Sequence, residues 1–498
     1  MTLAYGCLLA ALVAVCILHV RRIWLARWPA TVVAVCAAGS ALAGSAMLAY
    51  ADPNIFSVIA VILSGYVALQ AVRIIAWRQP ADYLYRNASL GLSWLMVMLL
   101  ATALASMAVM RADAGETVLA VLLVALQLIV SIGALTSSLY QLKASRYVKP
   151  EQPLSDGKLP TVTVAVPVRD EGRQLEACLT SVLSSNYPKM EVLAYDDDSH
   201  DRTPDIIRSF AHAGVRFLRL GLGGRHGTAG GWLDKNKAYA ELAADASGEY
   251  ILFCGADIRL GVHSLRGLID YAVRSETAMV AIMPRNPVVA HVPLLQSMRY
   301  YWELRPPRWL FSRPPVLSSC WLIRRDVLDK AGGFAAVKQS MSPEAHLARY
   351  ATSHGGYAFI RSDDELAVTS EKPITDQRTT AVYRRYPQLH RRVELAALLT
   401  VGQSLLLIGP LVLAILAVVD SHIPVLLAVP ALSAWLLHAV AFACVQKSAF
   451  PHVGFLSAAV VMPVCIIWDI MYVHVSMLRY EFGEVSWKQR NVSRHVMR

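Results

Sequence analysis

Two groups of aspartates follow short apolar segments in the middle of the chain. Asp196 and Asp197 come directly after segment 192–195, and Asp257 closes a Gly-Ala-Asp tripeptide after segment 251–254. A carboxylate accepts several hydrogen bonds from hydroxyl or N–H groups and is a hard oxygen ligand for Mg²⁺ or Mn²⁺. These positions therefore suit binding of a polar or phosphorylated ligand, and the alternative is a pair of solvated acidic turns.

An α/β fold would bring these aspartates together. Segment 161–168 (TVTVAVPV) has the pattern of a buried parallel strand, as do 192–195 and 251–254. Apolar residues at helical spacing occur between them, at 173–185 and 203–211. Strand–helix alternation predicts a parallel sheet with crossover helices, and ligands bind beyond the carboxyl ends of such strands. Both aspartate groups fall at such ends.

The two ends of the chain have the composition of a membrane protein. Of the 498 residues, 55% are hydrophobic and only 17% are charged, whereas soluble domains carry about a quarter charged residues. Apolar runs long enough to span a bilayer concentrate on both sides of a soluble-type block. We predict four regions: 1–143 with about five transmembrane helices, 144–392 as a soluble-type α/β domain, 393–478 with two or three spans, and 479–498 as a basic tail.

Charge in the loops predicts the orientation. Arginines and lysines follow the first, third and fifth predicted spans (3–20, 55–76 and 117–141), whereas the loops after 29–49 and 88–110 are poorer in them. The positive-inside rule then places the middle domain and the basic tail in the cytoplasm, in an integral membrane protein of a bacterial-type plasma membrane. Run 453–478 carries Asp469, which is costly in a bilayer, so one C-terminal run is expected to be interfacial or re-entrant.

Six segments occur in order: VPVRDEG (166–172), YDDDSHDRT (195–203), DASGEYILFCGADIRL (245–260), WLIRRDVLDKAGGF (321–334), SPEAHLARY (342–350) and TSEKP (369–373). Together they resemble the family-2 inverting glycosyltransferases with the GT-A fold, which include ceramide glucosyltransferase and the hyaluronan and chitin synthases. The resemblance covers a little under half of the chain. It implies an α/β GT-A domain, inserted between N- and C-terminal transmembrane regions, that binds a nucleotide-diphosphate sugar, a UDP-sugar first of all.

The resemblance also implies roles for single residues. The donor would be held by Glu171, Asp196, Asp197, Lys235 and Gly333. Asp257 would be the ligand of Mg²⁺ or Mn²⁺, although Gly255 stands where the family has the first aspartate of its D-x-D motif. Glu344 takes the place of the catalytic base. Ser342 and Pro343 before it also suit a helix start, so a plain first-turn glutamate remains the alternative.

The predicted reaction is transfer of one sugar to a lipid or glycan acceptor beside membrane lipids, with no role for nucleic acid. Segment 376–392 lacks the Q-x-x-R-W motif of polymerising relatives, so processive extension is not expected. Arg384 and Arg385 in this segment would contact either the diphosphate or anionic lipid headgroups, and we favour the headgroups. Residues 296–315 are predicted to lie at the membrane interface. The alternatives are a synthase that extends and exports a polysaccharide, and a catalytically inactive membrane scaffold or transport subunit.

Overall fold

The computed structural model describes residues 115–219, 232–286, 293–306, 314–389, 391–419, 425–488 and 490–491, with 35–36, 38–40, 42–47 and 50 near the N-terminus. The predicted spans 3–20, 55–76 and 88–110 and most of the glycine-rich stretch 221–235 lie outside these residues, and span 29–49 lies partly outside. Residues 127–391, 402–412 and 430–498 form one compact unit, to which the site belongs.

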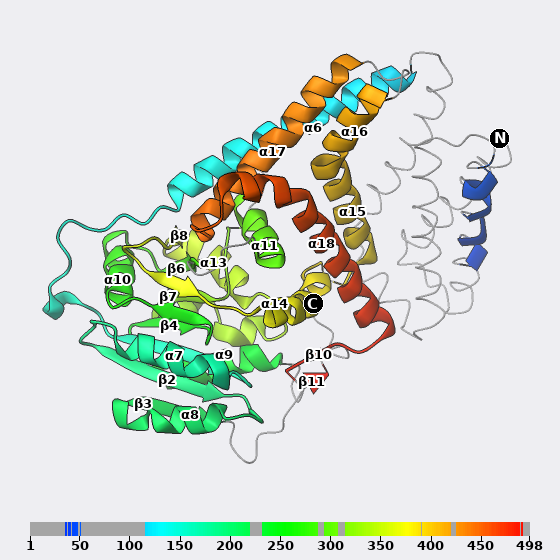
Figure 1. The fold of residues 1–498 in the computed structure, drawn as a ribbon. Coiled ribbons are helices and arrows are strands. Elements are labelled where there is room, and N and C mark those ends of the chain that lie inside the picture. The colour runs from blue at the N-terminus through cyan, green and yellow to red at the C-terminus, as the bar shows by residue number, and fades with distance from the viewer. Residues whose placement is uncertain are drawn as a thin grey trace. The chain divides into compact units, whose positions relative to one another are not determined.

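The centre of this unit is a seven-stranded mixed sheet with the order β3-β2-β1-β4-β7-β6-β8 (Figure 1). Its strands are β1 (Val162–Val168), β2 (Met190–Asp196), β3 (Val215–Arg219), β4 (Tyr250–Cys254), β6 (Met279–Met283), β7 (Cys320–Arg324) and β8 (Tyr357–Arg361). Strands β1 to β4 run parallel to one another as predicted, but β7 pairs antiparallel with both β4 and β6. The parallel arrangement predicted for the first strands is therefore confirmed, whereas the antiparallel strand β7 was not predicted from the sequence.

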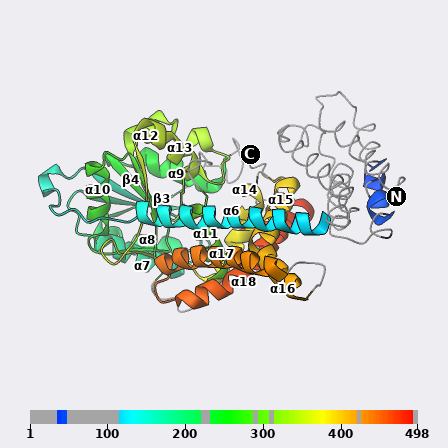
Figure 2. The same ribbon diagram turned by 90° about the horizontal axis from the view of Figure 1, so that it is seen from above.

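Helices cover both faces of the sheet (Figures 1 and 2). They are α7 (Gly172–Leu183), α8 (Thr203–Ser209), α9 (Asp234–Asp245), α10 (Ser264–Arg274), α11 (Leu294–Leu304), α12 (Arg325–Lys330), α13 (Pro343–His354) and α14 (Ile374–Gln388). Because side chains alternate along a strand, β1 sends Val164 and Val166 into the core on the α7 and α10 face and Ala165 into the core on the α9 face. On the latter face Phe253 and Trp321 stack with ring centroids 4.4 Å apart.

Four apolar stretches among the described residues are long enough to cross a membrane: Leu123–Ala144, Val393–Val419, Val425–Ala449 and Phe455–Phe482. The first belongs to α6 (Gly115–Ala144). The second consists of α15 (Val393–Gln403), a π-helical turn (Ser404–Ile408) and α16 (Gly409–Val419). The third comprises a 3-10 turn (Val425–Leu427) and α17 (Ala428–Ala449), and the fourth is α18 (Phe455–Phe482). They match the fifth N-terminal run and the three C-terminal runs expected from the sequence.

Helix α18 packs on the catalytic domain along its whole length. Its buried residues recur from Ala458 to Glu481 at helical spacing, whereas Leu456, Val460 and Ile467 on the other face are more than half exposed. Figure 1 shows α18 running past α11 and α14. After α18 the chain turns back in a short hairpin, β10 (Ser486–Trp487) and β11 (Arg490–Asn491), beside α14.

The packing at the start of β4 provides a test of the fold. A Cβ added to Gly248 would lie 2.5 Å from the Thr163 backbone nitrogen and 2.8 Å from the Tyr250 carbonyl oxygen, so strands β1 and β4 would have to separate. We expect Gly248→Ala to destabilise the protein by about 1–3 kcal/mol, the usual cost of overpacking. Thermal denaturation of the detergent-solubilised chain measures this as a lower midpoint. Gly157→Ala, where nothing lies within 4 Å of the added Cβ, is the matched control, and an equal midpoint for both variants would contradict the register.

Candidate active site

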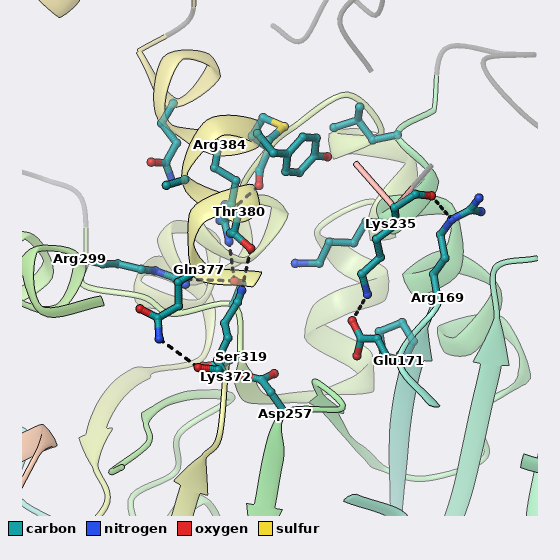
Figure 3. A pocket seen from close by; sticks show the side chains of 18 of the residues that line it. Arg169, Glu171, Lys235, Asp257, Arg299, Ser319, Lys372, Gln377, Thr380 and Arg384 are labelled. Carbon is teal, nitrogen blue, oxygen red and sulfur yellow. Dashed lines mark hydrogen bonds and ion pairs between the residues drawn. The ribbon is translucent and has the colours of Figure 1, made fainter. Parts of the chain in front are cut away.

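A pocket lies beyond the carboxyl ends of β1, β2 and β4, where the sequence predicted a ligand site. Its lining comes from the β1–α7 loop, the ends of β2 and β4, the start of α9, and helices α11 and α14. Figure 3 shows Glu171 and Arg169 on one side, Arg299, Gln377 and Arg384 on the other, and Asp257 between them at the base. We call these sides the β1–β2 wall and the α11–α14 wall.

Asp197 is fixed on the β1–β2 wall by Arg169, whose side chain is only 4% exposed. The Arg169 guanidinium donates a 2.5 Å hydrogen bond to the Asp197 backbone carbonyl and lies 3.7 Å from its carboxylate. The Asp197 N–H donates to the carbonyl of Val168, extending the pairing of β1 with β2. The Asp197 carboxylate is thereby held at the pocket with its charge partly balanced.

Asp196 occupies a different position from its neighbour. It is fully buried and does not line the pocket. Its carboxylate accepts a hydrogen bond from the Ser199 N–H at 3.1 Å and lies 3.7 Å from the Arg219 guanidinium. These contacts shape the loop after β2, so Asp196 holds the loop that presents Asp197, and its predicted contact with the donor stays a prediction.

Glu171 lines the pocket at the start of α7, where its N–H donates to the Thr203 hydroxyl at 3.0 Å. Its carboxylate forms an ion pair with Lys488, which also lines the pocket. Arg169 donates a 2.9 Å hydrogen bond to the Lys488 carbonyl. The hairpin after α18 therefore closes over the β1–β2 wall, a contact that no local sequence pattern indicates.

Asp257 lies at the base of the pocket, at the end of β4. The short strands β5 (Ile258–Leu260) and β9 (Val368–Ser370) pair Ile258 with Ser370, which brings the Ser370 hydroxyl within 2.8 Å of Asp257 Oδ2. A Cβ on Gly255 would lie 2.7 Å from Asp257 Oδ1. The Asp257 carboxylate thus occupies the space that a side chain at position 255, the first position of the D-x-D motif, would need.

Among the described residues, the carboxylate of Asp257 and the hydroxyl of Ser370 are the oxygen atoms at the base of the pocket that suit a divalent cation. The described residues contain no cluster of three or more carboxylate, histidine or cysteine ligands. Asp257 and the Ser370 hydroxyl supply hard oxygen atoms, which suit Mg²⁺ or Mn²⁺. Since Mg²⁺ is commonly held by one or two carboxylates together with substrate phosphates, a metal fits here as a one-carboxylate site completed by the ligand.

Positive charge dominates the pocket lining. Seven lining side chains are cationic (Arg169, Lys235, Arg299, Lys372, Arg384, Arg385 and Lys488), and three are carboxylates (Glu171, Asp197 and Asp257). Within the described part of the chain, Lys235, Arg299 and Lys372 have no carboxylate within 4 Å. Lys235 instead lies over the Tyr239 ring, Arg299 donates to the Ser318 hydroxyl and Lys372 to the Thr380 hydroxyl. The pocket is therefore prepared for an anionic ligand.

Glu344 lies behind the pocket rather than in its lining. It sits in the first turn of α13, 1% exposed. Its Oε1 atom is 3.3 Å from the Arg384 guanidinium, which also donates to the Ser318 hydroxyl at 2.8 Å. Glu344 Oε2 has no hydrogen-bond partner among the described residues. Ser342 makes no side-chain cap bond to α13, while Glu344 does lie in its first turn, so its role as the base stays a prediction beside the plain first-turn glutamate.

Gly333, the remaining predicted donor residue, begins the 3-10 turn Gly333–Val337 and does not line the pocket. Its φ of 58° and that of Gly332, 82°, lie in the left-handed region that favours glycine. The structure accounts for both glycines through the turn. Phe334, which follows them, is buried against Tyr239 and Phe253 below the pocket.

The favoured prediction for Arg384 and Arg385 is wrong. Expected at lipid headgroups, their side chains are 11% and 17% exposed and pair with Glu344 and Asp469 inside the protein. Residues 294–304 form α11, whose buried face includes Tyr300 and Tyr301, and the interfacial position expected for 296–315 stays a prediction. Sequence reasoning also missed Arg299, Lys372 and Lys488 as pocket residues, because the elements that carry them meet only in the folded chain.

Residues 163–332 match the family model described as glycosyl transferase family 2. The chain is 28% identical over 140 residues to a 4,4'-diaponeurosporenoate glycosyltransferase of Staphylococcus haemolyticus, a match covering 28% of this chain and 36% of the relative. It is 24% identical over 186 residues to the probable glycosyltransferase YdaM of Bacillus subtilis, covering 36% of this chain and 43% of the relative. The chain thus spans less than half the length of these curated relatives.

Among solved structures, the mannosyltransferase PcManGT from Pyrobaculum calidifontis, in complex with GDP-Man and Mn²⁺, is 18% identical with a TM-score of 0.41, covering 72% of this chain and 98% of that chain. Residues 1–349 of TarS of S. aureus, in complex with UDP-GlcNAc, are 14% identical with a TM-score of 0.28, covering 66% of this chain and 93% of that chain. The family match coincides with the strands and loops that build the β1–β2 wall and the base of the pocket. Residues 163–332 therefore form a domain that matches the glycosyl transferase family 2 model.

Proposed function

We propose that the protein is a membrane-embedded inverting glycosyltransferase that moves one sugar from a nucleotide-diphosphate sugar to a lipid or membrane-associated acceptor. One observation carries this proposal. One pocket combines Asp197 and Asp257, which follow the strands on either side of β1, with three cations. These cations, Lys235, Arg299 and Lys372, have no carboxylate within 4 Å in the described structure. A ligand with hydroxyl groups at one end and a diphosphate at the other would bind both the carboxylates and the cations.

The donor would lie along the base of the pocket. Its nucleoside would contact Asp197 and Glu171 on the β1–β2 wall, where carboxylates accept hydrogen bonds from ribose hydroxyls and base N–H groups. Its diphosphate would lie among Lys235, Lys372 and Asp257. The ion pair between Glu171 and Lys488 would open when the nucleoside takes up the Glu171 carboxylate, leaving the Lys488 ammonium beside the diphosphate.

A bound Mg²⁺ or Mn²⁺ would neutralise charge that develops on the leaving diphosphate. Asp257 would hold it from the protein side, with the Ser370 hydroxyl beside the carboxylate. Lys235, Arg299 and Lys372 would act on the same charge, because preorganised positive groups stabilise a developing anion. Support for the metal comes from the ligand chemistry of Asp257 and from the family resemblance.

Glu344 would act as the general base. In an inverting displacement the acceptor hydroxyl attacks the anomeric carbon, the bond from that carbon to the diphosphate oxygen breaks, and the hydroxyl proton passes to the base. The Arg384 guanidinium, 3.3 Å from Glu344, would hold the carboxylate in place. Because Arg384 lines the pocket and Glu344 lies behind it, the acceptor must draw the carboxylate forward or displace the guanidinium.

We also propose that the catalytic domain is cytoplasmic and that α18 lies against the membrane surface rather than across it. The C-terminal end of α17 contacts the domain, since the Asn286 N–H donates to the Ala449 carbonyl. The far end of α18 contacts it as well, through the Tyr480 hydroxyl and the Tyr383 carbonyl. Both ends of α18 therefore lie at the α/β domain, on the same side of the membrane, as expected for an interfacial helix. The basic tail that follows α18 then stays on the cytoplasmic side, as the positive-inside rule requires.

The experiment that tests this function screens nucleotide sugars against the purified chain, with and without Mg²⁺ or Mn²⁺. A ligand that binds only the folded state raises the denaturation midpoint, so one donor should raise it in the presence of metal. Asp257→Asn should remove the metal-dependent part of the shift and leave the midpoint without ligand unchanged. Release of nucleoside diphosphate from that donor then establishes an enzyme. If no donor shifts the denaturation midpoint, the result would favour the inactive scaffold. If the product contains many sugar units, it would favour the polysaccharide synthase.

The two buried lysines predict a pH dependence. Burial lowers the pKa of Lys235 to about 8 and the pKa of Lys372 to about 8. Both groups are charged below that pH and lose their charge as the pH rises through it, so affinity for the diphosphate should fall above about pH 8, by up to about tenfold per pH unit for each group. Calorimetric titration with UDP, or with the nucleoside diphosphate of the donor that the screen selects, measures this affinity at each pH.

Lys372→Arg gives a sharper test of the same charge, because a guanidinium stays protonated throughout this range. The loss of affinity above pH 8 should become shallower in this variant. Lys330→Arg, at a lysine whose side chain is 69% exposed on α12, should leave the profile unchanged. A flat profile in the wild-type protein would remove both lysines from the diphosphate site.

Replacement of Glu344 tests the base. Glu344→Gln keeps the size of the side chain but cannot accept the proton, so transfer should fall by roughly 10²-fold or more while nucleotide binding stays near normal. Glu344→Asp should retain part of the activity. Glu365→Gln is the control, since Glu365 pairs with Lys149 on the surface and should not affect transfer. Full transfer by Glu344→Gln would reduce Glu344 to a structural partner of Arg384.

A further inference from the structure

Asp469 is a carboxylate in the middle of the apolar helix α18, and it is fully buried. Its partners come from three other segments. Arg385 of α14 forms an ion pair with Oδ1, while Gln403 donates to Oδ2 at 2.9 Å and the Trp302 indole N–H donates to Oδ2 at 3.3 Å. A charge in a membrane-facing helix is expensive and is retained when it has a function. The cluster therefore needs an explanation beyond packing.

The Arg385 guanidinium connects this cluster to the pocket, because Arg385 is also one of the lining residues of the α11–α14 wall. Asp469 is its only carboxylate partner within 4 Å in the described structure. Burial, together with the nearby Arg299 and Arg384, lowers the pKa of Arg385 to about 10. Without Asp469, Arg385 would lose its only carboxylate partner within 4 Å in the described structure, and only the more distant Glu303 would offset the repulsion from Arg299 and Arg384.

Under the proposed function, the α11–α14 wall would face the acceptor. Asp197 and Glu171 mark the nucleoside end, on the opposite wall, and Asp257 lies at the base between the two walls (Figure 3). Under the proposed function the acceptor must approach from the side of the transferred sugar that faces away from the diphosphate. Arg385 stands on that side, and α18 packs against the two helices that form the wall.

We propose that Asp469 is a positioning residue that holds Arg385 at the acceptor end of the site, so that the helix facing the membrane sets the geometry in which a membrane lipid is accepted. This inference rests on the proposed function. It assigns to the Asp469–Arg385 pair an effect on transfer to lipid and none on donor binding. A pair with a purely structural role would affect both.

The test uses the full chain in detergent and compares two reactions of the same donor. One is donor hydrolysis by water, and the other is transfer to vesicles made from the total lipid of the membrane from which the chain is purified. We expect Asp469→Asn to lower kcat/KM for transfer to the vesicles by about 10- to 100-fold, since a small misplacement of a positioning group costs about this much. Hydrolysis and nucleoside-diphosphate binding should stay within about twofold.

A double-mutant cycle tests whether Asp469 acts through Arg385. Arg385→Gln should lose as much transfer as Asp469→Asn, and the double variant should lose no more than Arg385→Gln alone. Removing both charges also avoids an unpaired buried charge, so the double variant remains informative if Asp469→Asn alone fails to fold. Further loss in the double variant, beyond Arg385→Gln, would overturn the proposal.

Ser476→Ala is the matched control on the same helix. Ser476 donates to the Val382 carbonyl at 2.6 Å and accepts from the Tyr386 N–H at 3.1 Å, so its loss loosens α14 on α18 without touching Arg385. Selective loss of lipid transfer in Ser476→Ala would show that docking of α14 on α18, and not Arg385, controls lipid transfer, and would overturn the proposal. Full transfer by Asp469→Asn would also overturn it. A wild-type chain that hydrolyses the donor but modifies no vesicle lipid overturns this inference alone, whereas one that turns over no donor defeats the proposed function itself.

Discussion

The docking of α14 between the pocket and α18 is the constraint on which the site depends. One side of α14 supplies Thr380, Arg384 and Arg385 to the lining. Its backbone is held from the other side by the Ser476 and Tyr480 hydroxyls of α18. These bonds lie in an apolar, buried setting, where an unsatisfied polar group is costly. The position of α14, and with it the α11–α14 wall of the pocket, therefore depends on α18.

The distribution of charge follows from this arrangement. Cations that have carboxylate partners are held in fixed positions, as Arg384 is by Glu344 and Arg385 by Asp469. Lys235, Arg299 and Lys372 are bonded to neutral groups or lie over an aromatic ring, so their charge is directed at whatever enters the pocket. Surplus positive charge inside a protein lowers stability until an anion binds. The pocket is thus built for a phosphorylated ligand, and Asp257 is the one carboxylate at its base.

Much of the domain could be predicted because its signals are local. The apolar segments of β1, β2 and β4, the helical spacing in α7 and the aspartates after β2 and β4 depend on a few neighbouring residues, and the sheet edge brings Asp197 and Asp257 into one pocket as expected. Strand β7 was missed as an antiparallel strand because direction depends on how the chain returns to the sheet. Asp196 and Asp197 look alike in the sequence, and only their different burial separates a loop-holding carboxylate from one that lines the pocket.

The sequence by itself determined the glycosyl transferase family 2 domain, the apolar segments around it and the identity of the carboxylates that the pocket uses, because periodicity, composition and motif spacing are written in consecutive residues. Only the tertiary structure decided that Arg385 faces a pocket rather than lipid, that Lys488 reaches Glu171, and that Asp469 has a counter-charge. Each of these pairs joins residues far apart in the chain, and the choice of partner depends on which buried charges would otherwise remain unpaired. That balance exists only once the helices and the sheet have packed together.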